Sequence, residues 1–380
     1  MDSLARAEAH APELYAIRER IHRHPESGNH ETETAALVEK TLQELGITTQ
    51  RVTETGIVGT LRGSQPGLVT ALRADMDALP VTENSGAPFA SVIPGMMHAC
   101  GHDVHTTAVL GAAMILAEQR EKLRGEVRFF FEPDEEGNGG AQRMIRAGCM
   151  EGVDAVFGAH VAPDLPEGMI GVRYGKFYAA SDPFDVVMHG RSAHGAQPEK
   201  GIDALAAAAA AILALRGLPA AVIKDPAVLS VGTLHAGTAM NIIAERAEFS
   251  GIMRTLGPDD RECLKQAFRE TVERAASEFG AKAEIMIHGS YAGIVNSDAE
   301  TEVVQRTAEK LFGPDQVYVI DQPLMTTEDF GYFIDAAKGS FYHIGAGCSA
   351  PLHNSAFLPT PFTIIRLAAL HADIIGQYLL

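Results

Sequence analysis

The sequence predicts an α/β fold with a mostly parallel sheet and helices on both faces, into which a smaller α+β domain is inserted. Helical and strand-like apolar patterns alternate up to about residue 180 and again after about residue 290. Between these points the order of elements changes. A length of 380 residues with 46% hydrophobic residues can form two cores. We therefore expect a discontinuous domain of residues 1–180 and 291–380, and an inserted domain of residues 181–290.

The first part of the chain justifies the parallel sheet. Its apolar periods change repeatedly between helical and extended, and Gly46 marks one helix end. The expected elements, in order, are a charged helix within 1–26, helix 31–46, strands 56–63 and 67–75, helix 106–123, and strands 125–133 and 152–161.

The inserted part has a strand, helix, strand, strand, helix, strand order, which is typical of a ferredoxin-like (split βαβ) sheet. The expected ranges are strand 183–190, helix 201–217, strands 228–236 and 241–254, helix 258–279 and strand 281–288. The first domain then resumes with strand 316–321, helix 327–337, strand 339–345 and a closing helix that ends at Leu380.

Composition excludes several classes of partner. There are 31 basic and 49 acidic residues, a formal net charge of -18, and no basic run, which argues against nucleic acid and anionic membrane surfaces. The N-terminal stretch lacks the apolar segment of a secretory signal, and the apolar run 204–215 is too short to span a bilayer. The 4 cysteines are widely spaced, so we expect free thiols and a cytoplasmic protein.

Polar clusters follow three of the predicted strands: "RADMDALP", "EPDEEGNGGA" and "GAHVAPD". In open α/β sheets ligands bind beyond the carboxyl ends of the strands, so these clusters are expected to form one site. The stretch "PGMMHACGHDVHTT" (94–107) adds more candidate ligands. If this stretch is extended, His98, Cys100 and His102 point to one side and could bind a borderline-soft divalent metal. Taken alone, it fits a buried structural cluster equally well.

The acidic run contains Glu132, Asp134, Glu135 and Glu136. Such a run is often only a solvated loop. Adjacent carboxylates at a strand end can also supply one metal ligand and one general base for hydrolysis. His160 at the end of a buried strand and His353 in "SAPLHNSAF" are further candidate ligands.

Six motifs, "MHACGHDVHTT", "EPDEEGNGGA", "GAHV", "SAHGAQPEKGIDAL", "MTTEDF" and "LHN", together resemble one family over essentially the whole chain. It is the amidohydrolase branch of the aminoacylase and carboxypeptidase-G metallopeptidase superfamily, which includes hippurate hydrolases, N-acetyl-amino-acid deacetylases and auxin-conjugate hydrolases. The resemblance implies hydrolysis of N-acyl amino acids by two divalent metal ions, with Mn or Zn favoured and Co or Ni as alternatives. It implies five metal ligands: Cys100, His102, Glu136, His160 and His353.

The resemblance also implies the remaining roles. Glu135 matches the general base, and Cys100 matches a ligand shared by both ions. Asp77 matches an aspartate that orients a histidine ligand, while Asp75 stands where other branches have a histidine. We expect Asp77 and Asp103 to support ligand side chains. The inserted domain resembles the lid of this family. In this lid, His194 is expected to contact the substrate or the oxyanion, from its own subunit or from the other subunit of a homodimer formed through the lid.

Two further lid residues, Asn241 and Arg254, match groups that bind substrate oxygens, and Arg254 is expected to bind a carboxylate. His22, His24, His98 and His105 are interpreted as structural or supporting residues. The sequence departs from the usual family motifs at Glu132, Asp134, Asn138, His235, Ala236, Thr326 and Thr327. The alternatives to the amidohydrolase are a dipeptidase or carboxypeptidase of the same superfamily, a redox or zinc-storage protein, and a catalytically inactive binding protein.

Overall fold

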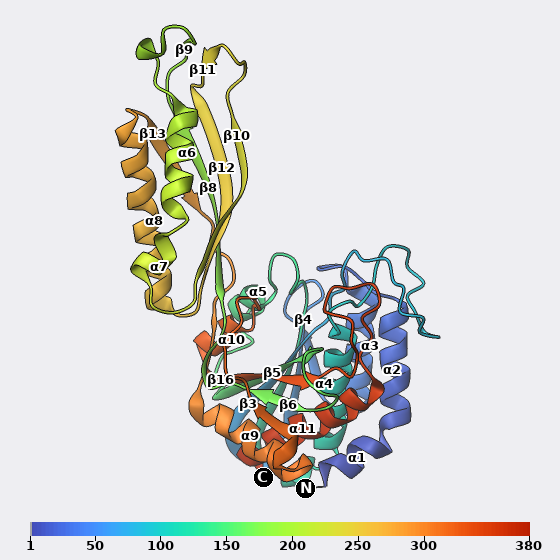
Figure 1. The fold of residues 1–380 in the computed structure, drawn as a ribbon. Coiled ribbons are helices and arrows are strands. Elements are labelled where there is room, and N and C mark those ends of the chain that lie inside the picture. Colours follow the sequence, from blue (N-terminus) through green and yellow to red (C-terminus); the bar gives the residue numbers. More distant parts are fainter. Residues whose placement is uncertain (1) are drawn as a thin grey trace. The chain divides into compact units, whose positions relative to one another are not determined.

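The chain folds into two compact units in a computed structural model that describes residues 2–380 (Figure 1). The first unit contains the chain up to Gly175 together with Asn296–Asp321 and Asp329–Leu380. The second unit contains Lys176–Val295 and Gln322–Glu328. The sequence had placed the boundaries near residues 180 and 290, and nothing in its pattern marked 322–328 as part of the smaller unit.

An eight-stranded sheet forms the centre of the first unit, in the order β1-β2-β4-β3-β5-β16-β6-β15. Its neighbours are parallel from β4 through β3 and β5 to β16, and between β6 and β15; the other pairs are antiparallel. The largely parallel sheet that the sequence predicted is thereby confirmed. The strands are β1 (Thr48–Arg51), β2 (Ile57–Arg62), β3 (Gln65–Asp75), β4 (Arg124–Glu132), β5 (Ala155–Ala162), β6 (Ile170–Val172), β15 (Val317–Val319) and β16 (Lys338–Gly345).

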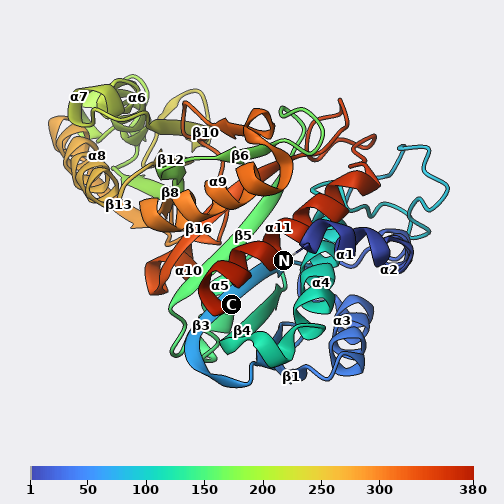
Figure 2. The same cartoon turned by 90° about the horizontal axis from the view of Figure 1, so that it is seen from below.

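Helices pack on both faces of this sheet (Figure 2). They are α1 (Ser3–Ala9), α2 (Ala11–Arg23), α3 (Thr32–Glu44), α4 (His102–Ala117), α5 (Ala141–Arg146), α9 (Asp298–Phe312), α10 (Gly331–Ala336) and α11 (Pro361–Leu379). Successive side chains of a strand point to opposite faces. Accordingly Phe129 of β4 belongs to the core beneath α4, while Phe130 stacks on Phe333 of α10 with ring centroids 5.5 Å apart.

The N-terminal helix differs from its prediction. One charged helix was expected within residues 1–26, but the chain forms α1 and α2 with a break at His10. Pro12 lies in the first turn of α2, where its missing N–H costs no helical hydrogen bond. A continuous helix through this proline would lose one.

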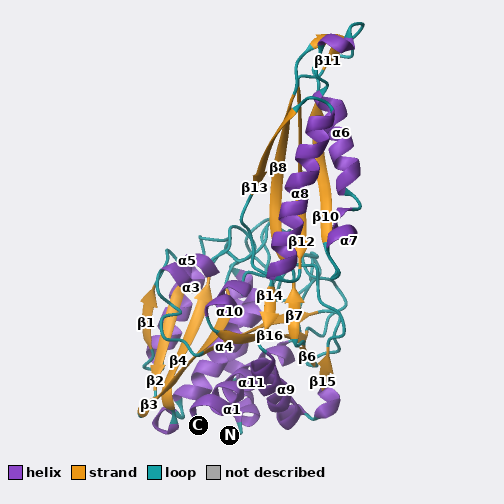
Figure 3. Ribbon diagram, turned by 90° about the vertical axis from the view of Figure 1, so that its left-hand side faces the viewer, coloured by secondary structure: helices purple, strands orange, loops and turns teal. Residues whose placement is uncertain are grey.

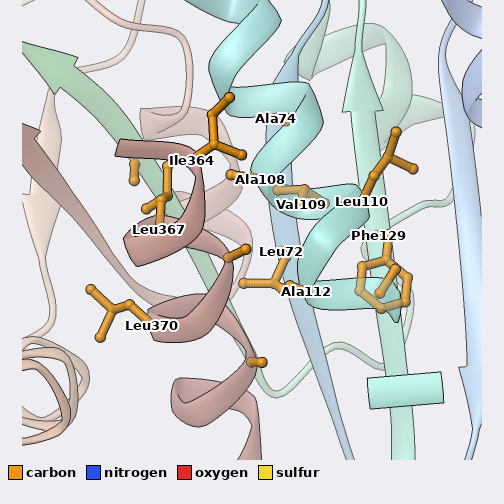
Figure 4. Packing of buried hydrophobic residues seen from close by; sticks show 14 of the residues in the cluster. Leu72, Ala74, Ala108, Val109, Leu110, Ala112, Phe129, Ile364, Leu367 and Leu370 are labelled. Atoms are coloured by element: carbon orange, nitrogen blue, oxygen red, sulfur yellow. The ribbon is translucent and has the colours of Figure 1, made fainter. Parts of the chain in front are cut away.

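The main core lies between the sheet and the pair α4 and α11 (Figure 4). Residues 102–116 of α4 are all buried, which its nearly continuous apolar sequence permits. Gly111 allows the two helices to approach closely, because a Cβ at this position would lie 2.8 Å from the Cβ of Ala368 and 3.1 Å from Leu14. This close packing fixes the position of α4, whose first residue is His102.

The second unit is a four-stranded antiparallel sheet, in the order β10-β12-β8-β13, with α6 and α8 on one face (Figure 3). The predicted strand 241–254 is divided into β11 and β12, and β11 pairs with β9 instead of the main sheet. The elements are β7 (Gly175–Tyr178), β8 (Ala180–His189), β9 (Ala193–His194), α6 (Ala204–Leu215), α7 (Leu218–Val222), β10 (Val228–Ala236), β11 (Ile242–Ile243), β12 (Arg246–Thr255), α8 (Pro258–Glu278), β13 (Lys282–Ile287) and β14 (Ile294–Asn296). Across residues 2–380 no helix combines the length and apolar character that crossing a membrane requires.

Candidate metal centre

Three parallel strands bring the polar clusters to one edge of the sheet. β3 lies between β4 and β5, and all three run in the same direction. Asp75 ends β3, Glu132 ends β4, and His160 lies near the end of β5. Because the carboxyl ends of parallel strands meet at one edge, the segments that follow them converge there.

Cys100 and His102 are placed by the start of α4. Gly101 has a φ of 86°, a conformation that favours glycine, and α4 begins at the next residue. The extended segment expected through His102 is therefore not formed, because His102 is already the first residue of the helix. Cys100 Sγ nevertheless lies 3.3 Å from Nε2 of His160. Donor atoms of Cys100, His102 and His160 all lie within 4.8 Å of one another.

Both of these histidines have a fixed ring orientation. Nδ1 of His102 donates to the carbonyl oxygen of Asp77 at 2.9 Å and lies 3.1 Å from its carboxylate, and Nδ1 of His160 donates to the carbonyl oxygen of Val161 at 2.8 Å. Such bonds leave Nε2 of each ring as the nitrogen that could bind a metal ion. Nε2 of His102 is buried and has no hydrogen-bond partner in residues 2–380. An orphaned buried acceptor beside a thiol and a second imidazole fits a metal ligand.

Glu136, in the acidic turn after β4, and His353, near the C-terminal end of the chain, complete the cluster. Oε1 of Glu136 lies 4.0 Å from Nε2 of His102 and 3.1 Å from Nε2 of His353. Donor atoms of Cys100, Glu136 and His353 form a second group within 4.8 Å, and His102, Glu135 and Glu136 form a third. The groups overlap at Cys100, His102 and Glu136. Overlapping groups of sulfur, nitrogen and oxygen donors fit two divalent cations of intermediate softness that share ligands.

His353 is held in a strained conformation. Its φ of 62° is unusual for a residue with a side chain, and its backbone N–H donates to the carbonyl oxygen of Ala99 at 2.8 Å. This bond ties the loop of His353 to the residue before Cys100. Strain of this kind persists only where the surrounding structure enforces it, and it often marks a functional site.

The electrostatics of the cluster also favour a cation. Burial, assisted by the carboxylates of Glu136 and Glu135, raises the pKa of the Cys100 thiol well above its usual value. Burial by itself lowers the pKa of His102, but Asp75 and Asp77 outweigh it and raise that pKa to about 10. A bound dication reverses this balance, because it stabilises the thiolate and the neutral imidazole.

Asp77 supports two of the predicted ligands at once. Its Oδ1 lies 3.1 Å from Nδ1 of His102, and its Oδ2 accepts the backbone N–H of Glu136 at 3.0 Å. Asp103 makes different contacts: its Oδ2 accepts hydrogen bonds from Arg18 and His22, each at 2.9 Å. These bonds attach α4 to α2 and involve none of the predicted ligand side chains.

Two other histidines lie near the cluster, and His105 forms a further group of possible metal donors with Asp75 and His102, within 4.8 Å of one another. His105 uses both ring nitrogens, because Nδ1 contacts Asp75 at 2.7 Å and Nε2 accepts the N–H of Val161 at 2.9 Å. Asp75, in turn, also accepts from Arg73 at 2.6 Å. His98 is buried, and burial lowers its pKa to about 4, but it belongs to none of the candidate metal groups formed by the described residues.

Arg73 is a residue of the site that was not among the candidates predicted from the sequence. This fully buried residue donates to Asp75 and Glu132 at 2.6 Å each and to Asp329 at 3.0 Å. The sequence did contain a signal for this role, because a charged arginine stands within the otherwise apolar run "GLVTALRAD". Glu132, which departs from the usual motif, accepts a hydrogen bond from Arg73, and Asp134 is bound by Arg143 at 3.2 Å. The extra acidic residues are therefore paired with arginines.

The predicted lid residues lie in the second unit. His194 of β9 pairs with Ile242 of β11, and Gly195 donates to the carbonyl oxygen of Asn241 at 2.7 Å, so exposed His194 and Asn241 are neighbours. Arg254 is near the opposite end of β12, where its Nη1 donates to the carbonyl oxygen of Met325 at 2.6 Å. Their polar groups are therefore presented at two separate places in this unit.

A thiol, three imidazoles and paired carboxylates at the carboxyl edge of a parallel sheet define the class of a metal-dependent hydrolase. The comparison with known families identifies the family. Residues 71–376 match peptidase family M20/M25/M40, and the chain belongs to this family. The predicted resemblance is confirmed.

Relatives and a solved structure agree with this assignment. N-acetyl-L-cysteine deacetylase of Bacillus subtilis is 36% identical over 358 residues, which cover 93% of this chain and 85% of the relative. Thermostable carboxypeptidase 1 of Saccharolobus solfataricus is 37% identical over 369 residues, covering 94% and 93%. The structure of Bacillus subtilis YXEP, described as a dinuclear metal-binding peptidase of the M20 family, matches with a TM-score of 0.88 at 33% identity and covers 98% of this chain and 99% of that chain.

Proposed function

We propose that this protein hydrolyses the amide bond of N-acyl amino acids, such as N-acetyl or N-benzoyl amino acids, to a carboxylic acid and a free amino acid. Two divalent cations would be held by Cys100, His102, Glu136, His160 and His353. The observation that carries this proposal is the orphaned, buried Nε2 of His102, which faces Glu136 beside Cys100 and the Glu135 carboxylate. The deacetylase relative supports the choice of substrate class.

The residues of the chain divide the reaction between them. When bound, the two cations would polarise the carbonyl group of the substrate and lower the pKa of the attacking water. Glu135, which is buried beside Glu136, accepts a proton from the attacking water and returns it to the departing amine nitrogen. His194 and Asn241 donate hydrogen bonds to the substrate or to the developing oxyanion. Arg254 pairs with the free carboxylate of the amino acid.

The identity of the cations is proposed from the donors. A thiolate and three imidazoles favour Zn, whereas the carboxylate oxygens also suit Mn, with Co and Ni as alternatives. Metal-stripped protein that is reloaded with each ion separately, and assayed for bound metal and for hydrolysis, distinguishes them. We expect about two ions per chain, with Zn or Mn giving the highest turnover.

A dipeptidase or carboxypeptidase activity is the second candidate, because one relative is named a carboxypeptidase. A panel of N-acetyl and N-benzoyl amino acids, matched dipeptides and amidated analogues separates the two. The proposed function predicts preferred cleavage of the N-acyl amino acids and a large loss of kcat/KM when the free carboxylate is amidated. Preferred cleavage of dipeptides would favour the alternative instead.

Assembly and location are also proposals. α6 buries small residues on one side, yet it exposes Leu205 and Leu213 to 45% and 69% on the other. Such an apolar stripe fits a contact with a second copy of the chain through the lid. A cytoplasmic location is supported by four cysteines that are all free thiols.

A further inference from the structure

His22 belongs to a buried group of four ionisable side chains that lies outside the proposed ligand set. Arg18 and His22 come from α2, Asp103 from the first turn of α4, and Glu83 from the segment between β3 and α4. The side chains are 2%, 0%, 0% and 4% exposed, respectively. Burying four charges is costly unless each is paired, so this arrangement needs an explanation.

Both nitrogens of the His22 ring are used in ion pairs. Nδ1 lies 2.9 Å from Oδ2 of Asp103, and Nε2 lies 3.1 Å from Oε1 of Glu83. Burial by itself lowers the pKa of His22, but Asp103 and Glu83 outweigh it and raise that pKa to about 9. The group therefore has two positive and two negative members at neutral pH, and its charges balance.

Each acidic partner of His22 leads to a proposed metal ligand. Asp103 is the residue after His102. Glu83 is followed by Asn84, whose N–H donates to the carbonyl oxygen of Ser355 at 2.7 Å, in the loop that carries His353. Glu83 also accepts a hydrogen bond from the backbone N–H of Ser91 at 2.6 Å. This bond holds the segment 80–97 close to His22.

We propose that His22 is a positioning residue, whose doubly bonded ring holds the segments of His102 and His353 at the spacing that metal binding needs. It cannot be a ligand in this arrangement, because neither ring nitrogen remains available. The α2 helix thus acts as a support for the site, although it contributes no ligand. The inference rests on the proposed metal centre.

The test is zinc binding to metal-stripped protein, measured by competition with a zinc-binding dye, for the parent, His22→Gln, Glu83→Gln and the double variant. Substitution of such supporting residues typically weakens metal affinity about 10- to 100-fold. We expect that loss in both single variants, with an unchanged number of ions at saturation. The double variant is expected to recover part of the affinity, since it removes one charge of each sign.

His24→Gln is the matched control, because it changes a histidine of the same segment that is only half-buried. It should bind zinc as the parent does. Circular dichroism and the melting temperature of the metal-free forms separate a general loss of stability from a loss of metal affinity. If His22→Gln does not accumulate, Glu83→Gln and the double variant carry the test.

Parent-like zinc affinity in His22→Gln, or in Glu83→Gln and the double variant, would overturn the inference, even if those variants melted earlier. Strictly additive losses in the double variant would also contradict it. A parent protein that binds no zinc or manganese at all would refute the proposed function instead, so the two failures are distinguishable.

Discussion

At the scale of single residues, the site depends on side chains that orient ligands as much as on the ligands. Asp77 binds the ring of His102 with one oxygen and the backbone of Glu136 with the other. It therefore sets the distance between an imidazole and a carboxylate that are both proposed as metal ligands. The two contacts use both oxygens of the carboxylate, so the loss of this one residue would disturb two proposed ligands.

We predict that Asp77→Ala weakens metal binding about 10- to 100-fold. The ring of His102 loses its carboxylate partner, and the turn at Glu136 loses its backbone acceptor. Isothermal titration of metal-stripped protein measures the effect. Asp164→Ala, at an exposed aspartate, serves as the control, and equal affinities of the two variants would contradict this role of Asp77.

The residues around Arg73 lead to a prediction on pH. Three fully buried carboxyl groups, those of Asp75, Glu132 and Asp329, share this one guanidinium. Burial and the neighbouring Asp329 raise the pKa of Glu132 well above its ordinary value of 4.5, against the opposing effect of Arg73. The neutral, protonated form of Glu132 is therefore the one that the folded protein favours.

The sign of the pH effect follows from linkage. A carboxyl whose pKa is raised by folding contributes stability that is fully present below the unfolded pKa and is lost as the pH rises through the folded pKa. Glu132→Gln keeps the shape and cannot ionise. We predict that the variant and the parent unfold at similar urea concentrations at about pH 5, and that the variant becomes progressively more stable toward about pH 9. A pH-independent difference would show that Glu132 is ionised throughout.

At the scale of elements, the close packing of α4 against α11 fixes the position of α4, which begins at the candidate ligand His102. Gly111 is the point of contact, and any Cβ there would meet Ala368 at 2.8 Å. We predict that Gly111→Ala lowers the free energy of unfolding and that Gly111→Val lowers it further, by about 1–3 kcal/mol. Urea unfolding measures the change, and a more stable valine variant would be inconsistent with this packing.

The sequence could predict elements where its apolar periods are long. The strands that carry Asp75, Glu132 and His160 lie where their apolar runs indicated, and so does the sheet edge that they share. The start of α4 was placed too late, at residue 106, because the polar residues His102 and Asp103 do not look apolar although both are buried. The split of strand 241–254 was missed because it depends on pairing between β11 and β9, which no local pattern encodes.

Within the site, the spacing of residues along the sequence indicated which side chains could lie close together. It did not indicate which of their atoms lack a hydrogen-bond partner. His98, His102 and His105 are similar in sequence. Hydrogen bonds distinguish His105, which uses both ring nitrogens, from His102, whose Nε2 has no partner in the described chain. Both ring nitrogens of His98 also lack partners among the described residues, but His98 belongs to none of their groups of possible metal donors. The contacts of Asp103 with α2 depend on packing between distant segments, which periodicity does not reveal.

At the scale of the whole molecule, two units with separate cores divide the proposed work. The first contains the candidate metal centre, and the second carries the polar groups proposed to bind substrate. The exposed leucines of α6 allow a test of the proposed dimer. Leu213→Lys should lower the dimer affinity, as measured by sedimentation equilibrium, while metal content stays unchanged. A parent that is monomeric at all concentrations would refute the dimer.

In the proposed mechanism Glu135 transfers the proton, while its neighbours bind the metal ions. The most direct test of this mechanism is Glu135→Gln, assayed for bound metal and for hydrolysis of N-acetyl amino acids in the same preparation. We predict about two ions per chain and a turnover that is lower by about 10²- to 10⁴-fold, the usual contribution of a general base. Parent-like turnover in the metal-loaded variant would contradict this mechanism.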